Sequence, residues 1–198
     1  MTNEFTCLIL AAGKSRRFGS PKMHHVLASG LSVLQTTVQQ YASVFNTVNV
    51  LVNPEDHRLK PSLSDCGVTI IEVARSHEGL SQSIVQGVQR SAPTAGYLIA
   101  LGDMPFVTIN TLELVKNAMR QDTEGKIITL SVNGKRGNPI AFSHTYKKQL
   151  LTLVGDIGAK AIVKNNQTSL INIEVDDIGV FQDIDVLSDI PASHAFSR

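Results

Sequence analysis

Two hydrophobic periodicities alternate along the chain. Short, nearly continuous apolar runs, typical of buried strands, occupy residues 7–11, 47–52, 68–73, 97–101, 126–132, 139–142 and 169–175. Between these runs, apolar residues recur at helical spacing around residues 33–45, 80–88, 112–119 and 159–163. Ser32 is placed to cap the first helix, and Thr108 or Asn110 the third. Gly134–Gly137 predicts a turn between two late strands.

Strands that alternate with helices predict βαβ units. We therefore expect an α/β fold with three layers: a mostly parallel central sheet, helices on both faces, and a small antiparallel insertion after residue 132. The sequence contains no internal repeat, low-complexity tract or inter-domain linker, so we expect residues 1–198 to form a single domain. Ligands of such sheets bind beyond the carboxyl ends of the strands.

Composition narrows the possible functions. Of the 198 residues 42% are apolar and only 18% charged, which argues against a disordered chain. A formal net charge of +1 gives no reason to expect nucleic-acid or membrane-surface binding. The two cysteines lack a CxxC arrangement, so a thiol metal site is not indicated. No segment resembles a signal peptide or reaches transmembrane length, and we expect a cytoplasmic protein.

The loop after the first strand combines small residues with positive charge. Ala11, Ala12 and Gly13 allow a ligand to approach the backbone closely. Four cations follow within nine residues: Lys14, Arg16, Arg17 and Lys22. Backbone N–H groups together with cations suit a polyphosphate. The alternative is a basic surface turn, and the spacing matches neither the P-loop nor the dinucleotide-binding fingerprint.

Carboxylates follow two other predicted elements. Asp103 comes directly after the apolar run 97–101, where it can hold Mg²⁺ beside a ligand in the crevice. Asp183 and Asp185 lie near the end of the chain, and Asp185 is the better candidate for a second metal carboxylate. The alternative for each of the three is an ordinary turn.

Several motifs together resemble a known family. Residues 8–22 resemble the Leu-Ala-Ala-Gly-x-Ser-x-Arg-Met-Gly-x-x-Lys signature of the MobA-like NTP transferases, with Phe18 in place of Met. Residues 102–105 read Gly-Asp-Met-Pro, as in that family, and residues 183–185 resemble its late Asp-Ile-Asp motif. The Ala-Ala-Gly form is similar to the molybdenum cofactor cytidylyltransferase branch, whereas the guanylyl-transferring branch usually has Ala-Gly-Gly.

This resemblance implies a Rossmann-like nucleotidyltransferase fold and assigns roles to residues. Arg17, Lys22 and Asp103 become the catalytic candidates, and Asp103 and Asp185 the Mg²⁺ ligands. The implied nucleotide-binding positions are Leu10, Ala11, Ala12, Gly13, Arg17, Lys22, Gly79, Ser81, Ser83 and Asp103. The alternative role for Ser81 or Ser83 is to cap the helix that they open. The implied acceptor-binding positions are Asn138, Pro139 and Asp156, although Asp156 is equally suited to an N-cap.

Three departures from the family pattern bear on the acceptor and on activity. Asn138 replaces the histidine of the family's Gly-His-Pro. Lys160 replaces the arginine of Gly-Asp-x-Gly-Ala-Arg, which keeps the positive charge but loses the planar, forked guanidinium group. His24 and His25 replace an apolar pair, and we expect them to be exposed.

The implied reaction transfers CMP from CTP to a phosphorylated acceptor of the molybdopterin type and releases pyrophosphate, with a molybdoenzyme as a further possible partner. The alternatives are transfer of another nucleotide such as a guanylyl group, a different acceptor such as a sugar-alcohol phosphate, or a regulator that binds nucleotide without catalysis.

Overall fold

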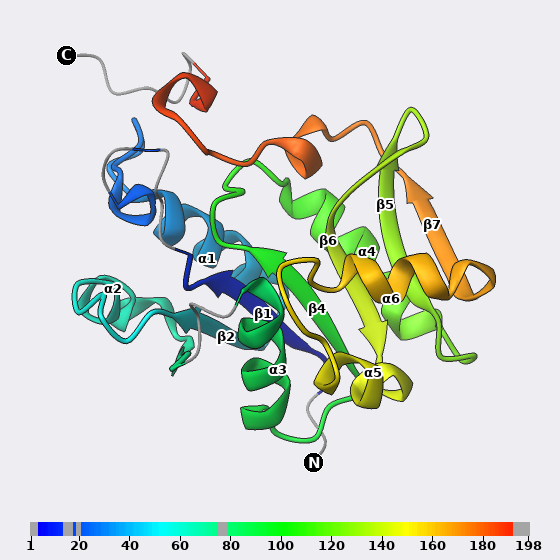
Figure 1. Cartoon of the computed structure of the whole chain (residues 1–198). Coiled ribbons are helices and arrows are strands. Elements are labelled where there is room, and N and C mark those ends of the chain that lie inside the picture. The colour runs from blue at the N-terminus through cyan, green and yellow to red at the C-terminus, as the bar shows by residue number, and fades with distance from the viewer. Residues whose placement is uncertain (1–3, 14–17, 19–20, 75–78, 192–198) are drawn as a thin grey trace.

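The central element is one seven-stranded sheet, in a computed structural model that describes residues 4–13, 18, 21–74 and 79–191. The strands are β1 (Thr6–Ala11), β2 (Thr47–Val52), β3 (Thr69–Glu72), β4 (Gly96–Leu101), β5 (Ile127–Val132), β6 (Lys135–Ser143) and β7 (Leu170–Glu174). Their order is β3-β2-β1-β4-β6-β5-β7 (Figure 1). Only β6 runs antiparallel to its neighbours, β4 and β5. The predicted mostly parallel sheet with an antiparallel insertion is confirmed.

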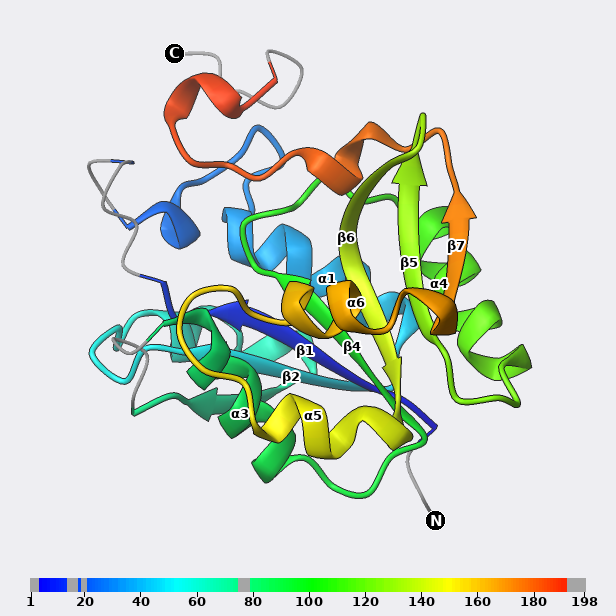
Figure 2. The same cartoon turned by 45° about the vertical axis from the view of Figure 1, so that its right-hand side comes forward.

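Helices cover both faces of the sheet, as Figure 2 shows. The α-helices are α1 (Val33–Val44), α2 (Leu59–Ser62), α3 (Leu80–Arg90), α4 (Ile109–Gln121), α5 (Lys147–Leu151) and α6 (Lys160–Asn165). Short 3₁₀ helices are η1 (Lys22–His24), η2 (Ser64–Cys66), η4 (His144–Tyr146), η5 (Gln167–Ser169), η6 (Ile178–Phe181) and η7 (Leu187–Asp189). One core lies under α1 and α4, and the other under α3, α5 and α6. None of the described helices has the length and apolar character needed to cross a bilayer.

The N-caps predicted for α1 and α4 are confirmed, whereas the serine cap considered for α3 is not present. Ser32 forms a capping box with Gln35 at the start of α1, and Thr108 caps α4. At α3, however, neither serine caps the helix. The first two N–H groups of α3 instead donate to residues of a distant loop: Leu80 to the Asp156 side chain at 3.2 Å, and Ser81 to the carbonyl of residue 155 at 3.1 Å.

The hairpin between β5 and β6 is tighter than expected. The turn is made by Asn133 and Gly134, both with positive φ (51° and 74°), and β6 begins at Lys135. The prediction of a turn over Gly134–Gly137 was therefore wrong, because Asn-Gly is itself the preferred pair for a two-residue hairpin loop. Gly137 lies within β6, where a Cβ atom would meet Val180 of η6 at 2.6 Å.

The segment after β7 is anchored to the start of α4 by Asp177. Its Oδ2 atom accepts hydrogen bonds from the Thr108 backbone N–H at 2.8 Å and from the Thr111 hydroxyl at 2.6 Å. Its Oδ1 atom accepts from the Gly179 N–H at 2.9 Å. Gly179 packs so closely against the carbonyl of Phe106 that a side chain would not fit. These contacts hold η6 against the start of α4.

Beyond η6, the Ile184 N–H donates to the carbonyl of Asp103 at 2.9 Å. The Ile184 side chain is fully buried in a small cluster with Phe18, Leu27 and Val33. Ile184 is thereby fixed beside both Phe18 and the turn that follows β4.

Replacement of Asp177 with alanine should lower the free energy of unfolding by about 2 kcal/mol, because it removes both a helix cap and the anchor of η6. Urea denaturation measures the loss. The exposed neighbour Asp176, replaced with alanine, is the matched control and should change stability by less than about 0.5 kcal/mol. Equal losses in the two variants would contradict the anchoring role.

Candidate active site

Three side chains from distant parts of the sequence meet at the carboxyl edge of the sheet. Lys22 lies in η1 after the β1 loop, Asp103 follows β4, and Asp185 comes from the end of the chain. The Lys22 ammonium lies 2.6 Å from Asp103 Oδ2 and 2.9 Å from Asp185 Oδ1. Because β1 and β4 are adjacent and parallel, their following loops emerge at the same edge, as the sequence pattern predicted.

This ion triad is largely shielded from water. The Lys22 and Asp103 side chains are only 10% and 17% exposed, and Asp185 is 30% exposed. Burial raises the pKa of Asp103, although the Lys22 ammonium opposes that effect. Burial acts to lower the pKa of Lys22, but Asp103 and Asp185 outweigh it and raise this pKa above its ordinary value. Lys22 therefore stays charged and balances two carboxylates where water screens them poorly.

A third carboxylate joins the group. Oxygen atoms of Asp103, Asp183 and Asp185 all lie within 4.8 Å of one another. Asp183 and Asp185 flank buried Ile184, and the carboxylates of both lie close to that of Asp103. Sequence reasoning gave Asp183 no metal role, although the alternation of acidic and apolar residues at 183–185 was the available signal. Three clustered carboxylates are a donor set suited to a hard divalent cation.

The residues implied for nucleotide binding divide into two groups. Leu10, Ala11 and Ala12 are buried at the end of β1, while Gly13 is exposed and has open space where a side chain would project. Open space at this position leaves the backbone accessible to a ligand. Arg17, with Lys14 and Arg16, lies outside the described residues.

The start of α3 forms the other group. Ser81 is fully buried and its hydroxyl donates to the carbonyl of Val154 at 3.1 Å, so it helps to fix the 154–156 loop. Ser83 is also buried, and Gly79 has a positive φ of 109°. The Asp156 carboxylate accepts a hydrogen bond from the Leu80 N–H at the start of α3. Asp156 therefore caps a helix, but the helix is α3 and not the one that follows it in sequence.

A cleft of about 700 Å³ opens beside the carboxylate cluster, between β6, α6 and η6. Asn138 and Lys160, two of the departures from the family pattern, both line it, as does Asp183. Pro139 is buried in β6, and Asp156 does not line this cleft. The structure therefore brings Asn138, but not Asp156, to the space next to the carboxylates.

His24 and His25 are half-buried rather than exposed, so that expectation was wrong. The Nε2 atom of His24 lies 2.8 Å from Asp56 Oδ2, and the His25 ring meets Phe18 edge-on at 5.4 Å between centroids. His24 thus ties η1 to the segment after β2, and His25 packs against Phe18.

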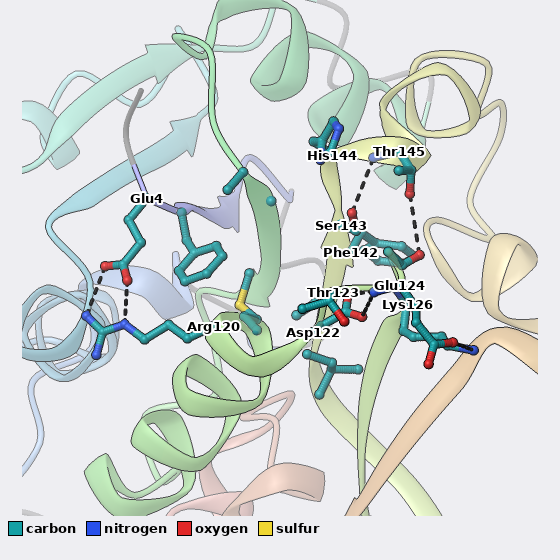
Figure 3. Close-up of a pocket in the computed structure, with 17 residues that line it drawn as sticks. Glu4, Arg120, Asp122, Thr123, Glu124, Lys126, Phe142, Ser143, His144 and Thr145 are labelled. Atoms are coloured by element: carbon teal, nitrogen blue, oxygen red, sulfur yellow. Dashed lines mark hydrogen bonds and ion pairs between the residues drawn. The ribbon is translucent and has the colours of Figure 1, made fainter. Parts of the chain in front are cut away.

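A second hollow, of about 480 Å³, lies at the opposite edge of the sheet, where β4 begins and β6 ends. Figure 3 shows that its charged side chains face one another: Arg120 donates to Glu4 at 3.0 Å, and Lys126 pairs with Glu124 at 2.8 Å. Each cation of this hollow has a carboxylate partner, and the remaining carboxylate, Asp122, accepts hydrogen bonds from two backbone N–H groups.

Comparisons with known proteins bear on the family and on the fold. The model of the MobA-like NTP transferase domain family matches residues 7–170. A probable molybdenum cofactor guanylyltransferase from Natranaerobius thermophilus is 26% identical over 76% of this chain and 74% of its own length. Rv0371c from Mycobacterium tuberculosis has a similar structure, with a TM-score of 0.82, 23% identity and 96% of each chain covered. A nucleotidyl transferase from Methanothermobacter thermautotrophicus gives a TM-score of 0.79 at 20% identity, with 94% of each chain covered.

Replacement of Lys22 with glutamine should lower the free energy of unfolding of the metal-free protein by roughly 3 kcal/mol, because it leaves two carboxylates together without a counter-charge. Chemical denaturation in a chelator measures this loss. Lys126→Gln, which breaks the more exposed pair with Glu124, is the control and should cost about 0–1 kcal/mol. Similar losses in both variants would show that the Lys22 triad is an ordinary surface pair.

Proposed function

This chain belongs to the family of MobA-like NTP transferase domains, and we propose that it transfers CMP from CTP to the molybdenum cofactor and releases pyrophosphate. The observation that carries the proposal is the convergence of Lys22, Asp103 and Asp185 at the carboxyl edge of the sheet. A nucleoside triphosphate with its divalent cation needs carboxylates to hold the cation and a positive group to contact the phosphates. Here Lys22 and the carboxylate cluster lie side by side.

The family match leaves the base of the donor nucleotide open, and we propose that it is cytosine. Ala12 gives the β1 loop the Ala-Ala-Gly form of the cytidylyl-transferring branch. A synthetase solved with CTP shares the fold, with a TM-score of 0.70, 16% identity and 87% and 90% of the two chains covered. Guanylyl transfer is the alternative, since the Natranaerobius relative is described as a probable guanylyltransferase.

The residues present fit a divalent cation, which we propose to be Mg²⁺ held by Asp103 and Asp185, with Asp183 in reach. Their three carboxylates are oxygen donors of the kind that Mg²⁺ prefers. One structure of Rv0371c is described as a complex with manganese, in a protein with the same fold. When bound, the ion would neutralise charge on the phosphates during transfer.

The chemistry needs no strong general base. An oxygen of the acceptor phosphate attacks the α-phosphorus of the nucleotide, the bond between that phosphorus and the bridging oxygen breaks, and pyrophosphate leaves with the bond electrons. A phosphate monoester has its second pKa near ~6, so the attacking oxygen is already ionised at neutral pH. This chain's residues therefore act by positioning and by charge.

Lys22 has a different partner in each state of this scheme. In the ligand-free protein its ammonium balances Asp103 and Asp185. A metal–nucleotide complex brings both a cation for these carboxylates and phosphates for the ammonium. Lys22 would then turn to the phosphates and, with Arg17, offset the charge on departing pyrophosphate.

Asp103→Asn should reduce CMP transfer by at least about 100-fold while the far-UV circular dichroism spectrum stays unchanged, because asparagine keeps the shape but loses the charge. Exchange of labelled pyrophosphate into CTP, with the molybdenum cofactor present, measures the reaction. Asp65→Asn, at an exposed site in η2, should retain full exchange. A wild-type protein that binds nucleotide but shows no exchange would favour the regulator instead.

CTP with Mg²⁺ should raise the melting temperature by roughly 5–10 °C at about 100 times its Kd, because tight binding to the folded state stabilises it. GTP and ATP at the same concentration should raise it by several degrees less. A larger shift with GTP would overturn the choice of donor and favour guanylyl transfer.

A further inference from the structure

The Lys22 ammonium already uses carboxylates that are proposed to hold the metal ion. It donates to Asp103 Oδ2 at 2.6 Å and to Asp185 Oδ1 at 2.9 Å, distances typical of charge-assisted hydrogen bonds. Oxygens of these two residues and of Asp183 lie within 4.8 Å of one another and form the proposed donor set. Two of the three carboxylates are therefore engaged by a cation that belongs to the protein itself.

A divalent cation that arrives without a nucleotide can reach these carboxylates in two ways, and both are unfavourable. If the ion displaces Lys22, the ammonium gives up two short hydrogen bonds, although its side chain is only 10% exposed and a shielded charge needs a partner. If the ion binds beside Lys22, two positive charges lie close together where water screens them poorly. Either way, Lys22 weakens the binding of the free ion.

The turn that carries Lys22 is held independently of its ammonium. Met23 is buried in the core under α1 and α4, and the Nε2 atom of His24 lies 2.8 Å from Asp56 Oδ2. Neither contact involves Asp103 or Asp185. An exchange of partners by Lys22 is therefore a movement of one side chain on a fixed turn, and a substitution at position 22 should leave η1 in place.

A triphosphate changes this balance, because its oxygens offer the ammonium another set of anionic partners. Charge-assisted hydrogen bonds to phosphate can replace those to Asp103 and Asp185. The carboxylates are then available to the divalent cation, and the ammonium is not left without a partner. The nucleotide and the cation would each favour the binding of the other, since coupling between two ligands is reciprocal.

We infer that Lys22 is an internal counter-ion that keeps free divalent cations out of the carboxylate cluster until a nucleotide binds. The inference rests on the proposed function, because it takes the cluster as the metal site and the nucleotide phosphates as partners of Lys22. It gives Lys22 effects of opposite sign in two states. Lys22 opposes the cation when the nucleotide is absent, and it supports the complex when the nucleotide is present.

Titration with Mn²⁺ alone tests the first of these effects without any turnover. The electron paramagnetic resonance signal of free Mn²⁺ falls as the ion binds, and its loss gives the Kd. We expect K22Q to bind Mn²⁺ at least about tenfold more tightly than wild type, because the competing charge is gone. K22R keeps that charge and should bind Mn²⁺ as weakly as wild type.

Lys135 provides the matched control for the loss of one positive charge. Like Asp183, it lines the cleft between β6, α6 and η6, but it is exposed and its ammonium lies over the Phe181 ring, 4.8 Å from the centre. K135Q should change the Kd for Mn²⁺ by less than about twofold, because exposed charges are well screened by water. A gain in K135Q equal to that in K22Q would show a general effect of net charge and overturn the inference.

The second effect is measured with the nucleotide present. In excess Mn²⁺, calorimetry should give K22Q a Kd for CTP at least about tenfold higher than that of wild type, because glutamine cannot supply an ionic hydrogen bond to the phosphates. The same substitution would thus tighten one ligand and weaken the other. A general loss of structure would weaken both.

A stability measurement extends the test to a K22Q protein that folds poorly. Bound Mn²⁺ would replace the missing counter-charge, so it should raise the melting temperature of K22Q by at least about 5 °C more than that of wild type. K22Q/D103N lacks both charges of the shorter ion pair and should show no such gain. In wild type itself, Mn²⁺ bound as tightly without CTP as with it would overturn the inference, whatever K22Q does.

The outcomes distinguish the inference from the proposed function. If folded K22Q binds Mn²⁺ alone no more tightly than wild type, Lys22 does not exclude the ion, and CMP transfer by wild type would leave the proposed function standing. If Mn²⁺ binding behaves as expected but wild type with the molybdenum cofactor, CTP and Mg²⁺ transfers no CMP, the proposed function fails while the counter-ion role of Lys22 remains.

Discussion

The geometry of the site depends on the charge balance between Lys22 and the carboxylates of Asp103 and Asp185. Without a cation these carboxylates would repel one another in surroundings that screen charge poorly, since Asp103 is mostly buried. The Lys22 ammonium, 2.6 Å from Asp103 and 2.9 Å from Asp185, holds η1, the turn after β4 and the segment around Asp185 together. Under the proposed function, a metal–nucleotide complex would replace these ionic contacts with contacts of its own.

The fold supplies the rigid parts on which this balance rests. Parallel β1 and β4 direct their loops to one edge, while antiparallel β6 brings its starting residues to the same edge, where they line the cleft beside the carboxylates. Asp177 and Gly179 bind η6 to the start of α4, and a backbone hydrogen bond from Ile184 fixes the last carboxylates beside Asp103. The segment 177–185, which contains no strand, is therefore as important to the site as the sheet itself.

Much of this organisation could be predicted from the sequence, since the periodicity of apolar residues shows the strands and helices, and strand ends show where loops converge. The approach of Lys22 to Asp103 follows from that topology. The direct ion triad and the capping of α3 by Asp156 could not be predicted, because both depend on side-chain placement between segments far apart in sequence. The Asn133-Gly134 turn and the alternation at 183–185 were visible as local patterns, but the turn was assigned to residues 134–137 and Asp185 was preferred to Asp183 as the metal carboxylate.

The most direct measurement is a crystal structure of the protein with Mn²⁺ and a non-hydrolysable CTP analogue, with manganese located by its anomalous scattering. We predict one manganese peak bound by Asp103 and Asp185 together with phosphate oxygens, and the Lys22 ammonium moved from the carboxylates to the phosphates. A nucleotide bound in an ordered manner with manganese away from Asp103, or with Lys22 still paired to Asp103, would contradict the account.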